Sequence, residues 1–127
     1  MEPILRSLQF CDAVVPAQAG KLTCYGVFAD LYAAQFPATY PRFSILTTWG
    51  SGTGFHIQVI KMFNPTKSMQ LHQSPEMYFT LDDESQTVHV QVDLNQIVFA
   101  EPGSYVFQVF LDSRMVAEYR LNYHKRG

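Results

Sequence analysis

The stretch from Glu101 to Asp112 constrains the fold of this chain more than any other part of the sequence. It opens with Pro102-Gly103, a pair that interrupts regular structure, and then alternates between apolar and polar side chains. The apolar positions that share one face are Tyr105, Phe107, Val109 and Leu111. The positions on the other face are Ser104, Gln108 and Asp112, with Val106 and Phe110 as apolar exceptions. A repeat of two residues is typical of a strand with one buried face, so this stretch predicts a strand that packs on a core.

A second apolar run follows after a short break, and we expect the two runs to form the last hairpin of the fold. Pairing Asp112 with Val116 keeps the apolar residues of both strands on one face. In that register Val109 lies opposite Tyr119, whereas a two-residue loop would mix apolar and polar faces. The sequence therefore predicts a three-residue loop, Ser113-Arg114-Met115, between these strands.

Comparable runs recur along the chain, bounded by glycine, proline and polar turns. We expect strands near residues 4–12, 22–32, 43–49, 55–63, 76–81, 87–94, 104–112 and 116–123. Charged residues make up only 16% of the 127 residues and aromatic residues 14%, a balance that favours strands over helices. The sequence therefore predicts one domain, residues 1–127, folded as an antiparallel immunoglobulin-like β-sandwich of about eight strands. A jelly roll is the alternative topology.

The spacing Glu101-x-Gly103-x-Tyr105 adds a local argument for the immunoglobulin-like form. It is similar to the tyrosine corner of such domains, in which a Tyr lies near the start of the penultimate strand and its hydroxyl bonds to backbone a few residues upstream. Phe107 stands where antibody domains carry a Cys. The pattern therefore predicts a backbone contact for the Tyr105 hydroxyl.

The alternation also predicts which side chains of two other strands are buried. Near residues 55–63 we expect the core-facing set Phe55, Ile57 and Val59 and the solvent-facing set His56 and Gln58. Near residues 87–94 we expect the core-facing set Val88, Val90, Val92 and Leu94 and the solvent-facing set His89, Gln91 and Asp93. A slip of one residue in the second strand would bury three polar side chains, so its faces are strongly specified.

The two cysteines of the chain fall on the first predicted hairpin. If that hairpin is centred between Ala17 and Gln18, Cys11 lies opposite Cys24, and directly opposed Cβ atoms are about 4.5–5.5 Å apart. A disulfide is then geometrically conceivable. Because we expect a reducing compartment, we predict two buried thiols instead.

Charge and hydropathy set the expected compartment and exclude two classes of partner. The formal net charge is -2, which argues against a nucleic-acid-binding surface or an anionic membrane surface. The first residues carry an early acid and no long apolar run, so we expect no signal peptide. No run approaches the ~20 apolar residues of a membrane-spanning helix. We therefore expect a cytoplasmic protein that binds neither nucleic acid nor membrane.

A set of turn and core motifs extends over most of the chain. These motifs are Phe10-Cys11-Asp12, Gly20-Lys21-Leu22, Gly26-Val27-Phe28, Phe36-Pro37-Ala38 and Phe99-x-Glu101-Pro102-Gly103-x-Tyr105-x-Phe107. Together they resemble the pattern of a bacterial family of small uncharacterised all-β proteins, a domain of unknown function. Members of that family tend to carry Gly where Ser113 stands, which agrees with the longer hairpin loop. The resemblance implies the fold and implies no activity, cofactor or site residue.

The patterns of catalytic and metal-binding sites do not occur in the sequence. The histidines, His56, His72, His89 and His124, form no metal-ligand spacing. Neither cysteine lies beside a histidine in sequence. The glycine-rich segment 50–54 lacks the Lys-Ser/Thr of a phosphate-binding loop, and the acids 82–84 are typical of a solvated turn. We therefore predict no catalytic, cofactor-binding or metal-binding residue and no bound cofactor.

A surface patch for a partner is the remaining candidate site. The residues that we assign to it are Trp49, Phe55, Met69 and His72, which lie at strand ends or in the long polar loop near residues 64–75. For Trp49 we favour packing against the core, and a place in the patch is its alternative role. We expect a binding or assembly module without catalysis, whose partner is a protein or a second copy paired through an edge strand. The alternatives are an enzyme with a Cys/His site assembled in space, and a small-ligand carrier.

Overall fold

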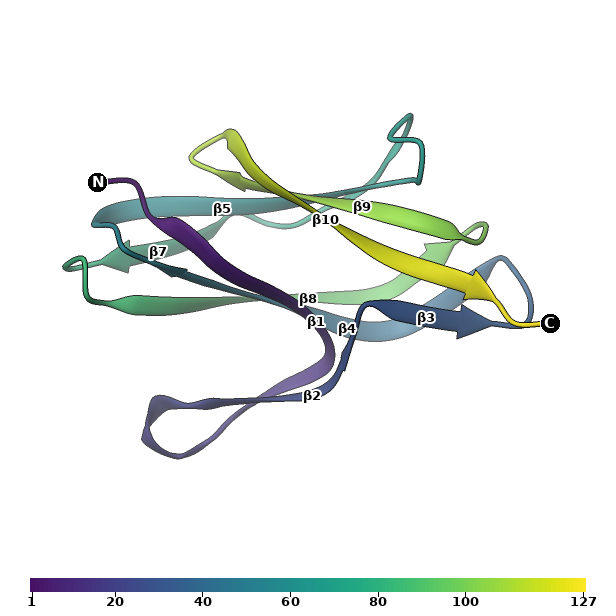
Figure 1. The fold of residues 1–127 in the computed structure, drawn as a ribbon, viewed down its shortest axis with the longest axis horizontal. Helices are drawn as coiled ribbons and strands as arrows, with labels where there is room; N and C mark the ends of the chain where they lie inside the picture. The colour runs from purple at the N-terminus through teal and green to yellow at the C-terminus, as the bar shows by residue number, and fades with distance from the viewer.

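The computed structural model describes residues 1–127 as two facing β-sheets with no α-helix (Figure 1). The four-stranded sheet has the order β2 (Leu22–Phe28), β1 (Ile4–Pro16), β4 (Ala38–Gly50), β8 (Thr87–Phe99). The six-stranded sheet has the order β3 (Asp30–Ala33), β10 (Arg114–Lys125), β9 (Gly103–Leu111), β5 (Gly54–Phe63), β6 (Gln70–Gln73), and β7 (Met77–Leu81) also pairs with β5. One short 3₁₀ turn, η1 (Gln18–Gly20), joins β1 to β2. The predicted all-β, two-layer fold is confirmed, with ten strands instead of eight.

Apolar side chains from both sheets meet in one core. The alternating residues of β9 that we predicted to be buried, Tyr105, Phe107, Val109 and Leu111, are all at most 1% exposed. Phe107 packs edge-on against Phe10 of β1, with 5.0 Å between the ring centroids. In β8, Val90, Val92 and Leu94 are likewise buried. Burial of apolar surface contributes roughly 25 cal/mol per Å², so this interface between the sheets stabilises the fold more than any single polar contact.

The predicted strand over residues 22–32 is wrong, because the chain changes sheets in its middle. Strand β2 ends at Phe28 in the four-stranded sheet, and β3 begins at Asp30 in the six-stranded sheet. The carbonyl of Ala29 between them accepts a hydrogen bond from the Asn122 amide at 3.0 Å, which attaches the crossing to β10. Strand β3 then runs parallel to β10. The fold is therefore not wholly antiparallel.

The predicted register of the first hairpin is also wrong. Cys11 lies opposite Val27 and not opposite Cys24. The turn is centred on Ala19, which has a positive φ of 59°, and this position shifts the pairing by three residues. Both cysteines are free thiols, Cys11 buried and Cys24 half-buried.

The last hairpin closes with a two-residue turn and not with the predicted three-residue loop. Asp112 and Ser113 both have positive φ, 50° and 70°, and such a turn matches the twist of a hairpin. The register then shifts by one residue near Val116, where β10 forms a bulge. The bulge returns the apolar residues of β10 to the core face, so that Val109 lies opposite Ala117 and not Tyr119.

The predicted faces of β5 are reversed. Gln58, Ile60 and Met62 point into the core, and Phe55 is exposed. Gln58 is accommodated because its side-chain oxygen accepts a hydrogen bond from the Trp49 indole at 2.8 Å and another from a threonine hydroxyl of β4. As a consequence, apolar side chains of β5 remain on the outer surface of the six-stranded sheet.

Candidate binding site

The outer surface of the six-stranded sheet carries exposed aromatic and aliphatic side chains around β5. Phe55 is 62% exposed and stacks on Tyr78 of β7, which is 60% exposed, with 5.7 Å between the ring centroids. Ile57 and Val59 continue the same side of β5 and are half-buried. Single exposed apolar residues are ordinary, but neighbouring ones that form a continuous surface are typical of interaction sites.

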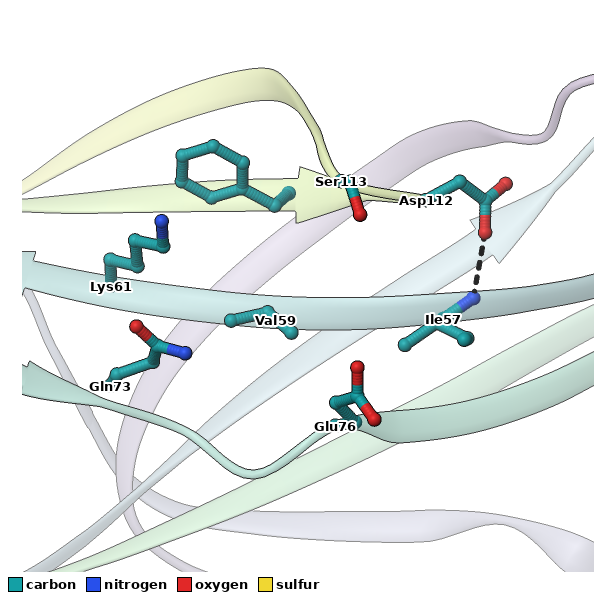
Figure 2. Close-up of a pocket in the computed structure, with 8 residues that line it drawn as sticks. Ile57, Val59, Lys61, Gln73, Glu76, Asp112 and Ser113 are labelled. Atoms are coloured by element: carbon teal, nitrogen blue, oxygen red, sulfur yellow. Dashed lines mark hydrogen bonds between the residues drawn. The ribbon is translucent and has the colours of Figure 1, made fainter.

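A groove of about 230 Å³ lies on this surface, and we call it the β5 groove (Figure 2). Its lining residues are Ile57, Val59, Lys61, Gln73, Glu76, Phe110, Asp112 and Ser113. Strand β5 supplies the middle of the groove, β9 and its turn supply one side, and the segment between β6 and β7 supplies the other. Pockets for drug-sized ligands span about 300–1,000 Å³, so this groove fits a smaller group, such as one long side chain.

The two ends of the β5 groove differ in charge. Figure 2 shows Lys61 and Gln73 at one end and Glu76, Asp112 and Ser113 at the other. Val59 lies between the two ends, and Ile57 lies at the acidic end beside Asp112. The Lys61 ammonium lies 4.4 Å from the centre of the Phe110 ring, a cation–π contact that holds it at its end. The groove therefore combines an apolar middle with one basic and one acidic end.

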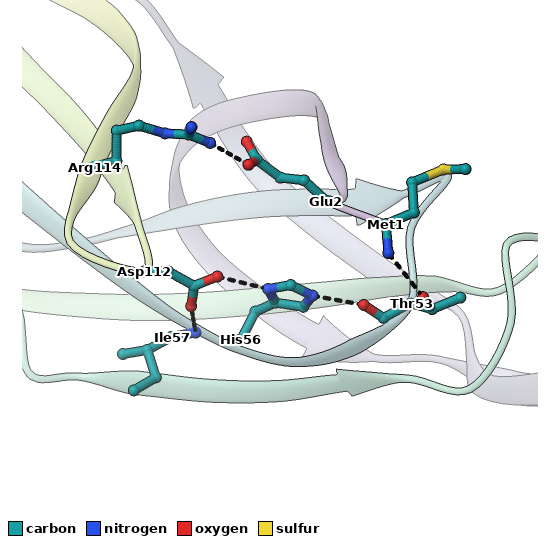
Figure 3. A network of polar contacts seen from close by, with 7 residues as sticks. All are labelled: Met1, Glu2, Thr53, His56, Ile57, Asp112 and Arg114. Carbon is teal, nitrogen blue, oxygen red and sulfur yellow. Dashed lines mark hydrogen bonds and ion pairs between the residues drawn. The ribbon is translucent and has the colours of Figure 1, made fainter.

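The acidic end is positioned by a network around Asp112 (Figure 3). One Asp112 carboxylate oxygen accepts a hydrogen bond from the Ile57 amide at 3.0 Å, and the other accepts one from His56 Nδ1 at 2.7 Å. Burial alone would raise the pKa of Asp112, but the hydrogen bonds from His56 and Ile57 outweigh it and hold the pKa below its ordinary value. Asp112 is therefore a carboxylate near neutral pH, with a fixed orientation.

The same network favours the protonated form of His56. Its Nε2 lies 2.7 Å from the carbonyl oxygen of Thr53, so both ring nitrogens face oxygens that can only accept hydrogen bonds. Burial lowers the pKa of His56, but the bonds to Asp112 and Thr53 raise it more, and the net shift is upward. In a catalytic triad the second ring nitrogen faces a nucleophile. Here a backbone carbonyl occupies that position, so the His56–Asp112 pair orients a carboxylate and offers no free base.

Further contacts connect this end of the groove to the first residues of the chain. Arg114 forms an ion pair with Glu2, and the amino group of Met1 donates to the Thr53 hydroxyl at 3.2 Å (Figure 3). These contacts are exposed, and exposed ion pairs contribute at most about 1 kcal/mol each. Their effect is to place the N-terminal segment beside the start of β5, which carries His56, and beside the β9–β10 turn, which carries Asp112.

The structure separates the residues of the predicted surface patch. Trp49 is fully buried in the core, so it takes no part in a surface site. Phe55 lies on the outer surface beside the β5 groove, and Met69 is exposed just before β6. His72 pairs with Met62, whose side chain points into the core. Our interpretation of the sequence did not identify the residues of the β5 groove. The one pattern that could have indicated them is that β5 and β9 carry apolar residues on both faces.

The thiols and acids of the chain show no second reactive centre. Burial, followed by the influence of Cys24, raises the pKa of Cys11 to about 11, so this thiol is protonated at neutral pH. No group of three or more His, Cys, Asp or Glu side chains lies close enough together to hold a metal ion. The structure also contains no helix with the length and apolar character needed to cross a membrane.

Comparison with known proteins adds a family but no activity. The family model of DUF6941, a family of unknown function, matches residues 6–124. No curated protein sequence matches the chain. The match therefore covers both sheets and every residue of the β5 groove.

Proposed function

The chain belongs to DUF6941, a family of unknown function, and we propose that it acts as a binding module without catalysis. Its binding site in this proposal is the β5 groove, and the occupant is a basic side chain, Arg or Lys, presented by a polypeptide partner. The observation that carries the proposal is a groove, open to solvent, with an apolar middle and the carboxylates of Glu76 and Asp112 at one end.

The dimensions and chemistry of the groove favour a long basic side chain. Such a side chain combines an aliphatic stem with a charged head, and the stem packs on apolar surface while the head stays at a polar edge. Ile57, Val59 and Phe110 supply the apolar surface. Glu76 and Asp112 supply two carboxylates for the guanidinium or ammonium group, and the planar guanidinium suits carboxylates best.

The basic end of the groove, at Lys61, determines the orientation in which an occupant binds. Lys61 repels a second cation and can donate to a backbone carbonyl or a carboxylate of the partner. The stacked pair Phe55 and Tyr78 lies further along the same face, and exposed aromatic residues are typical anchors of protein interfaces. A polypeptide segment that runs along β5 would contact both features, because Lys61 and Phe55 lie towards opposite ends of that strand, whereas a free amino acid would contact only one end.

Two observations favour this module over the alternative functions. The spatially assembled Cys/His enzyme needs a free imidazole nitrogen and a reactive thiol, but His56 uses both nitrogens and Cys11 is a weak acid. A carrier of the usual β-sandwich kind needs a cavity between the sheets. The β5 groove instead lies on the outer surface of one sheet.

We also propose that the sandwich is of the immunoglobulin type. The order β1-β4-β8 corresponds to strands A, B and E, and the facing order β10-β9-β5 corresponds to G, F and C. The Tyr105 hydroxyl donates to the Glu101 carbonyl at 2.6 Å, at the start of β9 where the tyrosine corner lies. This topology would leave the outer surface of the G-F-C sheet available for a partner.

A pair of labelled peptides tests the binding proposal. The first is a fluorescein-labelled heptapeptide with a central Arg between Thr and Val residues, and the second carries Gln in place of that Arg. By fluorescence polarisation we expect the Arg peptide to bind about fivefold more tightly, the factor that one partly exposed ion pair of about 1 kcal/mol provides.

Two variants locate the effect. Glu76→Gln should reduce the preference for the Arg peptide to less than about twofold, because one of the two carboxylates is lost. Glu84→Gln removes the same charge from the turn between β7 and β8 and should leave the preference unchanged. Equal affinity for both peptides, no binding of either at millimolar concentration, or an equal loss in both variants would each contradict the proposal.

A further inference from the structure

Strand β8 is the longest strand at an edge of either sheet. It spans Thr87–Phe99, ends the four-stranded sheet, and pairs only with β4. The edge strands of the six-stranded sheet are short, since β3 and β6 have four residues each and β7 has five. At the opposite edge of the four-stranded sheet, β2 is interrupted by Gly26, whose φ of 62° breaks the extended conformation. One backbone edge of β8 is therefore free over its whole length.

The free edge of β8 lacks the features that normally prevent pairing with another chain. Proteins protect long edges with Lys, Pro or a bulge. Residues 87–95 read Thr-Val-His-Val-Gln-Val-Asp-Leu-Asn and contain neither Lys nor Pro, and Asp93 is the one acidic residue among them. Their pairing with β4 runs without a register shift, and the first residue with positive φ is Gln96. Nine consecutive residues thus present an extended backbone to solvent.

We propose that two copies of this chain pair through β8, antiparallel, about a twofold axis at Gln91. The side chains of β8 that point away from the core are His89, Gln91 and Asp93, because Val90 and Val92 are buried. In this register His89 lies opposite Asp93 of the partner subunit, and the symmetry repeats the pair on the other side of the axis. The two four-stranded sheets become one sheet of eight strands, with about one new hydrogen bond per paired residue.

The charge pattern selects this register among its neighbours. An axis at Asp93 would oppose two carboxylates, and an axis at His89 would oppose two imidazoles, which is unfavourable when they are charged. An axis at Val90 or Val92 would leave His89 and Asp93 opposite uncharged residues. Favourable pairs across strands contribute about 0.2–1 kcal/mol each, and the Gln91 axis gains two pairs of His89 with Asp93 that the other axes lack.

The carboxylate in this pair is already ionised and oriented. Asp93 accepts hydrogen bonds from Gln91 at 2.9 Å and from the Ser44 hydroxyl at 2.6 Å, and these bonds hold its pKa below the ordinary value. Its side chain is 41% exposed, so it remains accessible to a partner. The inference rests on β8 alone and does not depend on the β5 groove.

Cysteine substitution along β8 tests both the pairing and its register. Gln91→Cys places two thiols across the axis, where Cβ atoms are about 4.5–5.5 Å apart, near the reach of a disulfide. Oxidised glutathione, which is reduced as the two thiols join, should therefore yield a covalent dimer on a non-reducing gel. His89→Cys places the thiols about 13 Å apart and should give no dimer. The wild-type protein controls for Cys11 and Cys24.

A charge exchange tests the proposed pair without cysteines. By sedimentation equilibrium the wild type should dimerise with rising concentration. His89→Asp should weaken the dimer roughly tenfold, because two carboxylates then face each other, and adding Asp93→His should restore it, because His and Asp again form the pair. A wild type that stays monomeric at millimolar concentration would overturn the proposal. Cross-linking through His89→Cys instead of Gln91→Cys, or no recovery in the double variant, would overturn the register.

Discussion

The hydroxyl of Tyr105 offers the sharpest stability test of the fold. Tyr105 is 1% exposed, and its hydroxyl donates to the Glu101 carbonyl at 2.6 Å and accepts from the Glu101 amide at 3.3 Å. Both bonds close the corner between β8 and β9. The variant Tyr105→Phe removes one oxygen atom and leaves the aromatic ring, so any loss of stability reports these two bonds.

The expected loss follows from the strength of the bonds. A neutral hydrogen bond contributes about 0.5–1.5 kcal/mol, and the longer of the two lies at the weak end of that range. We therefore expect Tyr105→Phe to lower the free energy of unfolding by about 1–2 kcal/mol. For a chain of this size that corresponds to a fall in Tm of roughly 4–8 °C.

Urea denaturation followed by far-UV circular dichroism measures this loss, and the chain offers a matched control. Tyr123 packs on the same ring as Tyr105, that of Phe99, with centroids 4.6 Å and 4.8 Å away. Its hydroxyl donates to no other residue, so Tyr123→Phe should change the stability by less than about 0.5 kcal/mol. If Tyr105→Phe is as stable as the wild type, or no less stable than Tyr123→Phe, the two hydrogen bonds of the Tyr105 hydroxyl do not stabilise the fold.

Three further predictions follow from the buried polar groups. The pKa of His56 in the folded protein is raised above its ordinary 6.5, so the stabilising effect of His56 is complete below about pH 6.5 and is lost as the pH rises through the folded pKa. Urea unfolding between pH 6 and 9 should show this decline in stability. The variant His56→Gln should show no such decline. A double-mutant cycle of Trp49→Phe and Gln58→Leu should give a coupling of about 1–2 kcal/mol, and strict additivity would contradict their buried hydrogen bond. In the folded protein at pH 7.5, iodoacetamide should modify Cys11 at least about 100-fold more slowly than in urea, and mass spectrometry showing equal rates would contradict its burial and its raised pKa.

The sequence predicts a strand's faces well only where one side of the strand is apolar. In β8, Val90, Val92 and Leu94 are buried as expected, because a slip of one residue would bury polar side chains. In β5 the pattern is ambiguous, since Ile57 and Ile60 lie on opposite faces. The choice depends on Gln58, whose burial is possible only because Trp49 and a threonine of β4 reach it across the core. Those contacts are distant in sequence, and no local pattern encodes them.

Register and sheet membership were hard to predict for a related reason. The bulge near Val116 and the positive φ angles of Asp112 and Ser113 change the pairing without changing the apolar pattern. The crossing at Ala29 depends on a hydrogen bond to Asn122, on the far strand β10. The β5 groove combines such non-local features, because its residues come from β5, β9 and the β6–β7 segment.

A titration of the ¹⁵N-labelled protein with the Arg heptapeptide, followed by ¹H–¹⁵N NMR, tests the central claim most directly. We expect the amide shifts that change to cluster in residues 57–61, 73–76 and 110–113, around the β5 groove. We also expect the Gln heptapeptide to cause smaller changes at the same amides. Changes spread over the whole surface, or gathered on the β1–β2 hairpin while these amides stay still, would contradict the assignment of the groove as the binding site.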